Sequence, residues 1–150
     1  FYGFVLDPAE DGMPDEEVLD RLDDADLPVI TYGGEGCPPS VIESALLGYD
    51  FPVIIAHCGG YPSNEAMMDR AIDLLDRHEQ CFLDTSLVRT RDPLERALME
   101  HPSQVVFGSG APEIHPNVAV MEILTLDVPE DAMRKVFSKN AGRLFDVLAP

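Results

Sequence analysis

Five short apolar segments recur along the chain at nearly constant intervals, and this repeat constrains the fold more than any other feature. Each segment is about five residues long, is rich in β-branched or aromatic residues, and ends in a polar residue or glycine. The segments end near positions separated by 25, 25, 27 and 26 residues, namely Asp7, Tyr32, His57, Asp84 and Gly110. Each interval accommodates one strand, a loop, a helix and a return loop.

The intervals carry helical patterns, in which apolar residues recur on one face. We predict helices over residues 15–26, 40–47, 64–78, 90–100, 117–126 and 129–137. Val18, Val41 and Met67 are among the residues expected to face the core. Strands that alternate with helices predict a parallel sheet joined by right-handed crossovers.

Two folds of parallel β/α units fit this pattern: an open doubly wound sheet, or part of a TIM (β/α)₈ barrel. In both folds ligands bind at the carboxyl ends of the strands. The five segment ends are therefore predicted to lie along one rim. His57 ends the apolar run of residues 52–56, and Gly59 and Gly60 follow it, so that the backbone is free to turn sharply there.

The composition restricts the partners. Twenty-eight acidic residues face ten basic ones, for a net charge of −18, and such a surface repels nucleic acid and anionic membranes. The acids are spread along the chain, which favours adaptation to high salt over a binding face for a cationic partner. Cys37, Cys58 and Cys81 show no CxxC spacing. We expect reduced thiols in a cytoplasmic protein that binds a small-molecule substrate, with Cys81 in the core.

The segments LPVITYGGEGCPPS, VIIAHCGGYP, CFLDTS, VVFGSGAP and KNAGRLFDVL, in this order and spacing, resemble the carboxyl-terminal half of the amidohydrolase-related family. This family of metal-dependent TIM-barrel hydrolases also includes decarboxylases and lactonases. The resemblance implies that the five strands are the fourth to eighth of a barrel. The first three, with the family's HxH metal pair, would precede Phe1, and we interpret the chain as part of a longer protein.

The resemblance also implies a divalent metal, expected to be zinc, with His57 as its ligand. Two family positions differ here. Tyr32 stands where the fifth strand usually carries a histidine, and Gly110 stands where the eighth usually carries an aspartate. That aspartate is the family's usual metal ligand and proton shuttle, and glycine can serve as neither.

Each candidate site residue has a functional and a structural interpretation. His57 is predicted to be catalytic and a metal ligand, or else a rim histidine bonded to backbone or substrate. Asp84 is predicted to be catalytic, or else to make an Asx-type contact in its own turn. Tyr32, Gly59 and Gly60 are predicted to bind substrate, although Tyr32 could simply pack at the barrel mouth.

Three further residues stand close to these strand ends. Asp7 is followed by Pro8, so that it is either a substitute ligand or a turn residue. Glu113 and His115 follow the vacant position at Gly110 and are candidates for a displaced ligand.

We predict a metal-dependent hydrolase acting on a small carboxylate, ester, lactone or amide, impaired by Gly110 and Tyr32. One alternative is a catalytically silent barrel that binds a ligand or a protein. Another is a complete, doubly wound domain. Half a barrel would expose two unpaired strand edges, so self-association to a homo-oligomer is a further expectation.

Overall fold

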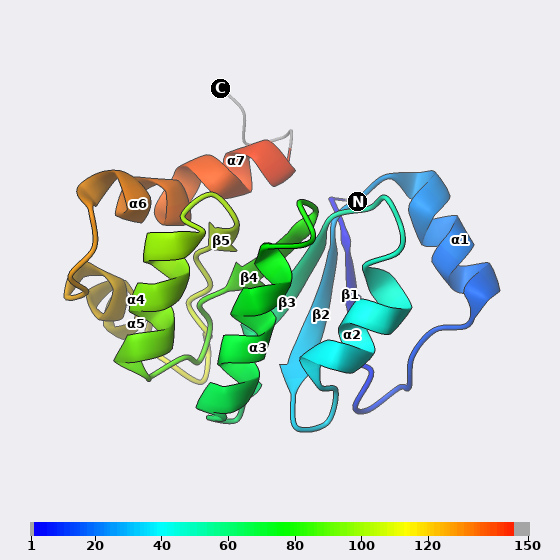
Figure 1. Cartoon of the computed structure of the whole chain (residues 1–150), viewed down its shortest axis with the longest axis horizontal. Helices are drawn as coiled ribbons and strands as arrows, with labels where there is room; N and C mark the ends of the chain where they lie inside the picture. The colour runs from blue at the N-terminus through cyan, green and yellow to red at the C-terminus, as the bar shows by residue number, and fades with distance from the viewer. Residues whose placement is uncertain (1, 146–150) are drawn as a thin grey trace.

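The structure, a computed structural model, describes residues 2–145 as one parallel five-stranded sheet with its helices (Figure 1). Phe1 and residues 146–150, which include the end of the KNAGRLFDVL segment, lie outside the described residues. The strands are β1 (Phe4–Leu6), β2 (Val29–Gly34), β3 (Val53–Tyr61), β4 (Cys81–Asp84) and β5 (Val105–Val106). The five predicted strands are thereby confirmed.

The helices follow the predicted order, with ends that differ by a few residues. They are α1 (Glu16–Ala25), α2 (Pro39–Leu46), α3 (Glu65–Leu75), α4 (Arg91–Glu100), α5 (Pro116–Leu124), α6 (Glu130–Arg134), the π-helical turn η1 (Lys135–Lys139) and α7 (Asn140–Leu144). The helix predicted over residues 129–137 is therefore extended to residue 144 through a π-helical turn. Within residues 2–145, no helix is both long and apolar enough to span a membrane.

The order of the strands decides between the two predicted folds. The strands lie side by side in chain order, β1-β2-β3-β4-β5, and each pair is parallel. A doubly wound sheet reverses its order at a switch point and carries helices on both faces. Here the order never reverses, and α2, α3 and α4 stand on the same side of the sheet (Figure 1). The doubly wound alternative is wrong, and the winding is that of consecutive barrel strands.

The two faces of the sheet differ in burial. On the helix-covered face Val29, Val53 and Leu83 are completely buried, as is Cys81, which confirms its prediction as a core residue. On the other face Ile54 and Ala56 of the central strand are also buried, whereas Val5 of the edge strand β1 is 62% exposed. In a closed barrel this second face would point to the interior. The chain thus has a buried layer between sheet and helices, and a second face that is buried at the central strand β3 and exposed at the edge strand β1.

Two residues predicted to face the core do not do so. Val18 in α1 and Val41 in α2 are both 43% exposed, whereas Leu19 and Ile42 beside them are buried. Helical periodicity indicates the direction of the apolar face. The width of that face depends on how closely the neighbouring element packs against the helix. The periodicity carries no information about that distance.

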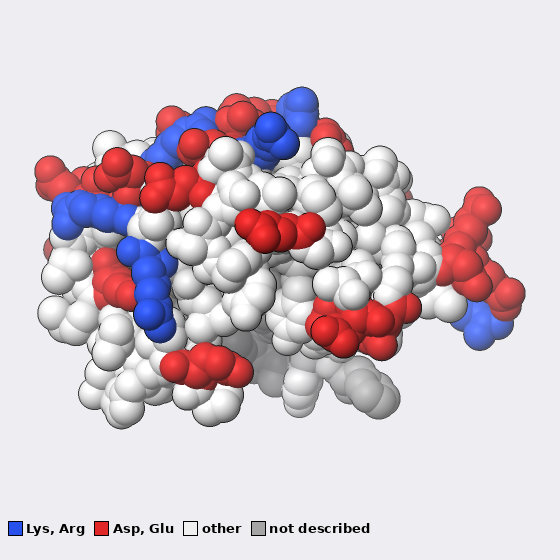
Figure 2. Space-filling view, turned by 90° about the horizontal axis from the view of Figure 1, so that it is seen from below, with Lys and Arg blue, Asp and Glu red and all other residues white. Residues whose placement is uncertain are grey.

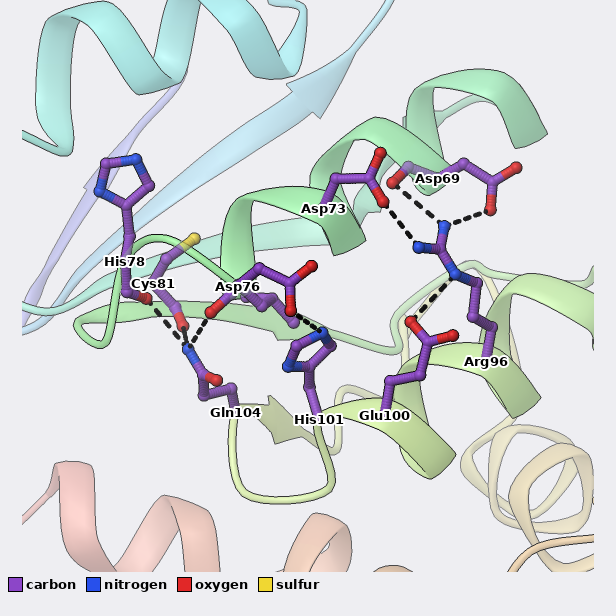
Figure 3. A network of polar contacts seen from close by, with 10 residues as sticks. Asp69, Asp73, Asp76, His78, Cys81, Arg96, Glu100, His101 and Gln104 are labelled. Atoms are coloured by element: carbon purple, nitrogen blue, oxygen red, sulfur yellow. Dashed lines mark hydrogen bonds and ion pairs between the residues drawn. The ribbon is translucent and has the colours of Figure 1, made fainter.

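An ion-pair cluster joins α3 to α4 on the outer surface (Figure 3). Arg96 of α4 contacts Asp73 at 2.6 Å, Asp69 at 3.0 Å and Glu100 at 3.1 Å. The hydrogen bond to Asp73, with the other carboxylates, raises the pKa of the guanidinium further. Below this cluster, the Gln104 side-chain amide donates to the carbonyls of His78 and Cys81, across the loops that lead into β4 and β5 (Figure 3).

The NAGRLF segment anchors the last strand. The buried Asn140 amide donates to the carbonyls of Pro102 and Val105, at 2.8 Å and 2.6 Å. Arg143 donates to the carbonyl of Ser103 and to the Asn140 side-chain oxygen. Because β5 contains only two residues, these side chains supply hydrogen bonds that a longer ladder would otherwise supply.

We expect Asn140→Ala to lower the free energy of unfolding by about 2–4 kcal/mol, because two buried carbonyls lose their donor. Urea denaturation measures this change. The matched control is Asn117→Ala, at an exposed position of α5, which we expect to change stability by less than about 0.5 kcal/mol. Equal losses in the two variants would contradict the anchoring role of Asn140.

Candidate functional site

A cavity of about 600 Å³ opens at the carboxyl ends of the strands. All five predicted rim residues line it: Asp7, Tyr32, His57, Asp84 and Gly110. Parallel strands bring their carboxyl ends to one edge of the sheet, which is why residues about 25 positions apart meet in one place. The prediction of a single rim is confirmed.

His57 enters this cavity through an unusual turn of the backbone. His57, Cys58 and Gly59 have φ angles of 60°, 47° and 71°, so that three consecutive residues are left-handed. The pairing of β2 with β3 shifts at this point, from Tyr32 opposite Ala56 to Gly34 opposite Tyr61. Left-handed conformations at non-glycine residues cost about 1–3 kcal/mol each and are concentrated at functional sites.

Gly59 and Gly60 make this turn fit against α3. A Cβ on Gly59 would lie 2.7 Å from Cβ of Ala71, and one on Gly60 would lie 2.7 Å from the carbonyl oxygen of Asn64. Both glycines are buried, and neither lines the cavity. Their place in the fold is the packing of the turn, and their contact with substrate stays a prediction.

The His57 ring is held on three sides. Its Nδ1 lies 3.0 Å from the carbonyl oxygen of Ser86 and 2.8 Å from Ser86 Oγ. Tyr32 stacks on the ring with centroids 5.5 Å apart and planes 7° apart, and Tyr61 lies against it at 5.2 Å. Tyr32 thus both packs on His57 and lines the cavity.

Asp84 joins the ends of β3 and β4. Its Oδ1 accepts from the backbone N–H groups of His57 and Ser86, both at 2.9 Å, and from Ser86 Oγ at 2.5 Å. The bond to the Ser86 N–H is the Asx-type contact that the sequence predicted as the structural alternative. The bond to His57 adds a second role, because it holds the strained turn.

Ser86 and Tyr61 were not identified from the sequence. Ser86 belongs to the LDTS segment, two residues after Asp84, and its position could have been noticed as the end of an Asx turn. Tyr61 lies beyond the double glycine. The bulge at residues 57–59, where β3 gains extra residues relative to β2, places its ring against His57.

Cys58 directly follows His57 but has no access to the cavity. Its side chain is completely buried and donates to the Asp84 carbonyl at 3.2 Å. Burial, with the Asp84 charge, raises the pKa of its thiol far above the ordinary value. A thiolate is the nucleophilic form of cysteine, so Cys58 is a structural residue.

The backbone at position 110 takes a conformation suited to glycine. Gly110 has a φ of 69°, and a Cβ there would lie 2.8 Å from Leu87 Cδ2 and 3.1 Å from Leu87 N. Leu87 is itself left-handed, with a φ of 57°. Leu87 therefore occupies the space into which a side chain at position 110 would project.

The described residues do not fit a metal by themselves. Within residues 2–145 no group of three His, Cys, Asp or Glu side chains is placed to hold a metal ion. Glu113 lines the cavity, but His115 instead accepts from the Asn117 N–H and caps α5. Asp7 accepts from the Glu10 N–H in its own turn. One imidazole falls short of the three protein ligands of a catalytic zinc site.

The amidohydrolase family profile matches residues 3–147 of the sequence. The chain therefore belongs to the amidohydrolase family, as its motifs suggested. No curated protein matches the chain.

Solved structures share the fold. An uncharacterised TIM-barrel protein from Bordetella bronchiseptica is 22% identical, with a TM-score of 0.74, over 89% of this chain and 50% of its own. A 4-oxalomesaconate hydratase from Rhodopseudomonas palustris is 15% identical, with a TM-score of 0.63, over 99% and 56%. A dihydroxybenzoic acid decarboxylase from Polaromonas sp. JS666, with bound manganese, is 13% identical, with a TM-score of 0.63, over 97% and 57%. The chain spans about half the length of these structures.

We expect Gly110→Asp to lower the free energy of unfolding by about 1–3 kcal/mol, because it adds strain at a positive φ and crowds Leu87. Urea denaturation checks this, with Gly48→Asp as the control. Gly48 is exposed, no atom would lie within 4 Å of a Cβ added to it, and its φ lies outside the left-handed range. A Gly110→Asp protein as stable as the control would contradict this prediction, because Leu87 and the backbone at position 110 would then adjust at little cost.

Proposed function

We propose that this protein is an amidohydrolase-family enzyme in which His57 acts on a small, uncharged ester, lactone or amide. The observation that carries the proposal is the His57 imidazole, held between two tyrosine rings at the edge of a cavity of about 600 Å³. Imidazole is the side chain best suited to exchange protons near neutral pH. A cavity of this size accommodates a small molecule.

The charge of the cavity supports an uncharged substrate over a free carboxylate. Five carboxylate side chains line it: Asp7, Glu10, Glu35, Asp84 and Glu113. Among the described lining residues there is no Lys or Arg. In the view onto the strand ends, acidic side chains lie on both sides of the lower middle, whereas basic ones gather at the left, the upper edge and the far right (Figure 2). An anion entering here would be repelled.

His57→Gln should abolish turnover of neutral esters or lactones in the full-length gene product, because it removes the proton-exchanging group. A substrate panel measured by steady-state kinetics checks this, with His78→Gln as the control. His78 bonds to Glu43 and does not line the cavity. Unchanged turnover in His57→Gln would overturn the proposal.

Removing a lining charge should improve the use of carboxylate substrates. We expect Glu113→Gln to raise kcat/KM for a carboxylate about two- to fivefold relative to its neutral methyl ester, since one repulsive charge in a partly solvated site is worth up to about 1 kcal/mol. Glu65→Gln, at an exposed position of α3 outside the cavity lining, is the control. A natural preference for the carboxylate in the unaltered protein would contradict the substrate class.

The family likeness adds a divalent metal to the proposal, zinc or manganese, with His57 as one ligand. Elemental mass spectrometry of the full-length gene product should find about one metal ion per chain, and His57→Ala should lose it while His78→Ala keeps it. Metal absent from all three proteins would leave His57 with the proton-transfer role alone.

A catalytically silent binding protein is the second candidate. It is favoured by position 110, where Leu87 fills the space of the expected carboxylate. Ligand binding measured by calorimetry without any turnover across the same panel would support it. Turnover that depends on His57 would exclude it.

A further inference from the structure

We infer that Ser86 is a positioning residue that fixes the tautomer of His57, so that the proton sits on Nδ1 and the lone pair on Nε2. This inference rests on the proposed role of His57 in the cavity. It applies equally if Nε2 takes up a proton or binds a metal, because both need the lone pair on that nitrogen.

The hydrogen-bond geometry leaves one consistent arrangement. A backbone carbonyl oxygen can only accept, and the Ser86 carbonyl lies 3.0 Å from His57 Nδ1. Nδ1 must therefore carry the proton for this bond to form. A neutral imidazole has one N–H, so Nε2 is left as an acceptor. Within the described part of the chain, Nε2 has no hydrogen-bond partner that would compete for its lone pair.

The Ser86 hydroxyl agrees with the same assignment. Its single proton is directed to Asp84 Oδ1, 2.5 Å away, because an ionised carboxylate only accepts. The Ser86 oxygen is then free to accept from His57 Nδ1 at 2.8 Å, so that the single Nδ1 proton is shared between this oxygen and the Ser86 carbonyl in a three-centre bond. The chain of bonds runs from the imidazole through Ser86 to Asp84, so positive charge that develops on the ring is stabilised by the carboxylate.

This arrangement also assigns a role to the serine. Ser86 faces Nδ1 and gives its proton to Asp84, so its oxygen is not activated by His57 as in a Ser-His-Asp triad, where the base takes the serine proton. Ser86 is 7% exposed, which limits the approach of a substrate carbonyl. Its function is orientation.

Two further contacts keep the ring in place. Rotating the imidazole by half a turn would bring a ring carbon, in place of Nδ1, against Ser86 and break both bonds. Tyr32 lies nearly parallel to the ring, with planes 7° apart, and Tyr61 contacts it from another side. The tautomer and the orientation of His57 are thus determined together.

Nitrogen-15 NMR of the unaltered full-length protein tests the inference directly. The long-range proton–nitrogen pattern of a neutral imidazole distinguishes the two tautomers, and loss of the signal in His57→Gln assigns it to that residue among the histidines of the protein. We expect a protonated Nδ1 and an unprotonated Nε2. A protonated Nε2 would overturn the inference, and this readout does not depend on finding a substrate.

Ser86→Ala provides the second test. The Ser86 carbonyl remains, so we expect a partial shift toward the other tautomer and a fall in kcat on the order of tenfold, with KM little changed. Ser109→Ala is the control, because Ser109 Oγ bonds only the Ala111 N–H among the described residues. Ser86→Ala with the unaltered nitrogen-15 pattern would overturn the role of the hydroxyl.

The two tests separate this inference from the proposed function. An Nδ1–H tautomer in a protein without turnover would retain the orientation by Ser86 and reject the enzyme. Turnover that depends on His57, together with a protonated Nε2, would support the enzyme and reject the orientation by Ser86.

Discussion

The carboxylate of Asp84 is the point on which the candidate site depends. One oxygen accepts from the backbone of His57, from the backbone of Ser86 and from the Ser86 hydroxyl. These bonds stabilise a left-handed turn that strands of ordinary geometry do not make, and they bind the end of β3 to the end of β4. The buried thiol of Cys58 adds a bond to the Asp84 carbonyl. Without this acceptor, the turn would have no evident compensation for its strain.

The winding of the sheet places that site. Because the strands follow one another without reversal, the described helices α2, α3 and α4 gather on one side of the sheet. The strand ends then surround one cavity, whose described lining is rich in carboxylates and aromatic rings. Membership of the amidohydrolase family accounts for the parallel β/α fold that carries the site. The residues differ from the family pattern at Tyr32 and Gly110.

The regular spacing of the strand ends made much of this predictable. The spacing of the apolar segments and their composition identified the strands and the parallel sheet. They also identified the rim that carries Tyr32, His57 and Asp84. The same reasoning failed where it needed distances. It did not reveal that Gly59 packs on α3. Val18 was assigned to the core because it lies on the apolar side of a helix, yet no element covers it fully.

The sequence by itself determined which residues reach the strand ends, because that depends on order and spacing along the chain. Only the tertiary structure decided how they interact there. Ser86 lies beside Nδ1 of His57, 29 positions away in the sequence, because two parallel strands are in register and an Asx turn points the hydroxyl back. Tyr61 reaches the same ring because three left-handed residues form a bulge in β3 and shift its register against β2. The double glycine marks a turn in the sequence, but the register shift and the left-handed residues His57 and Cys58 before it follow from how β2 and β3 pack.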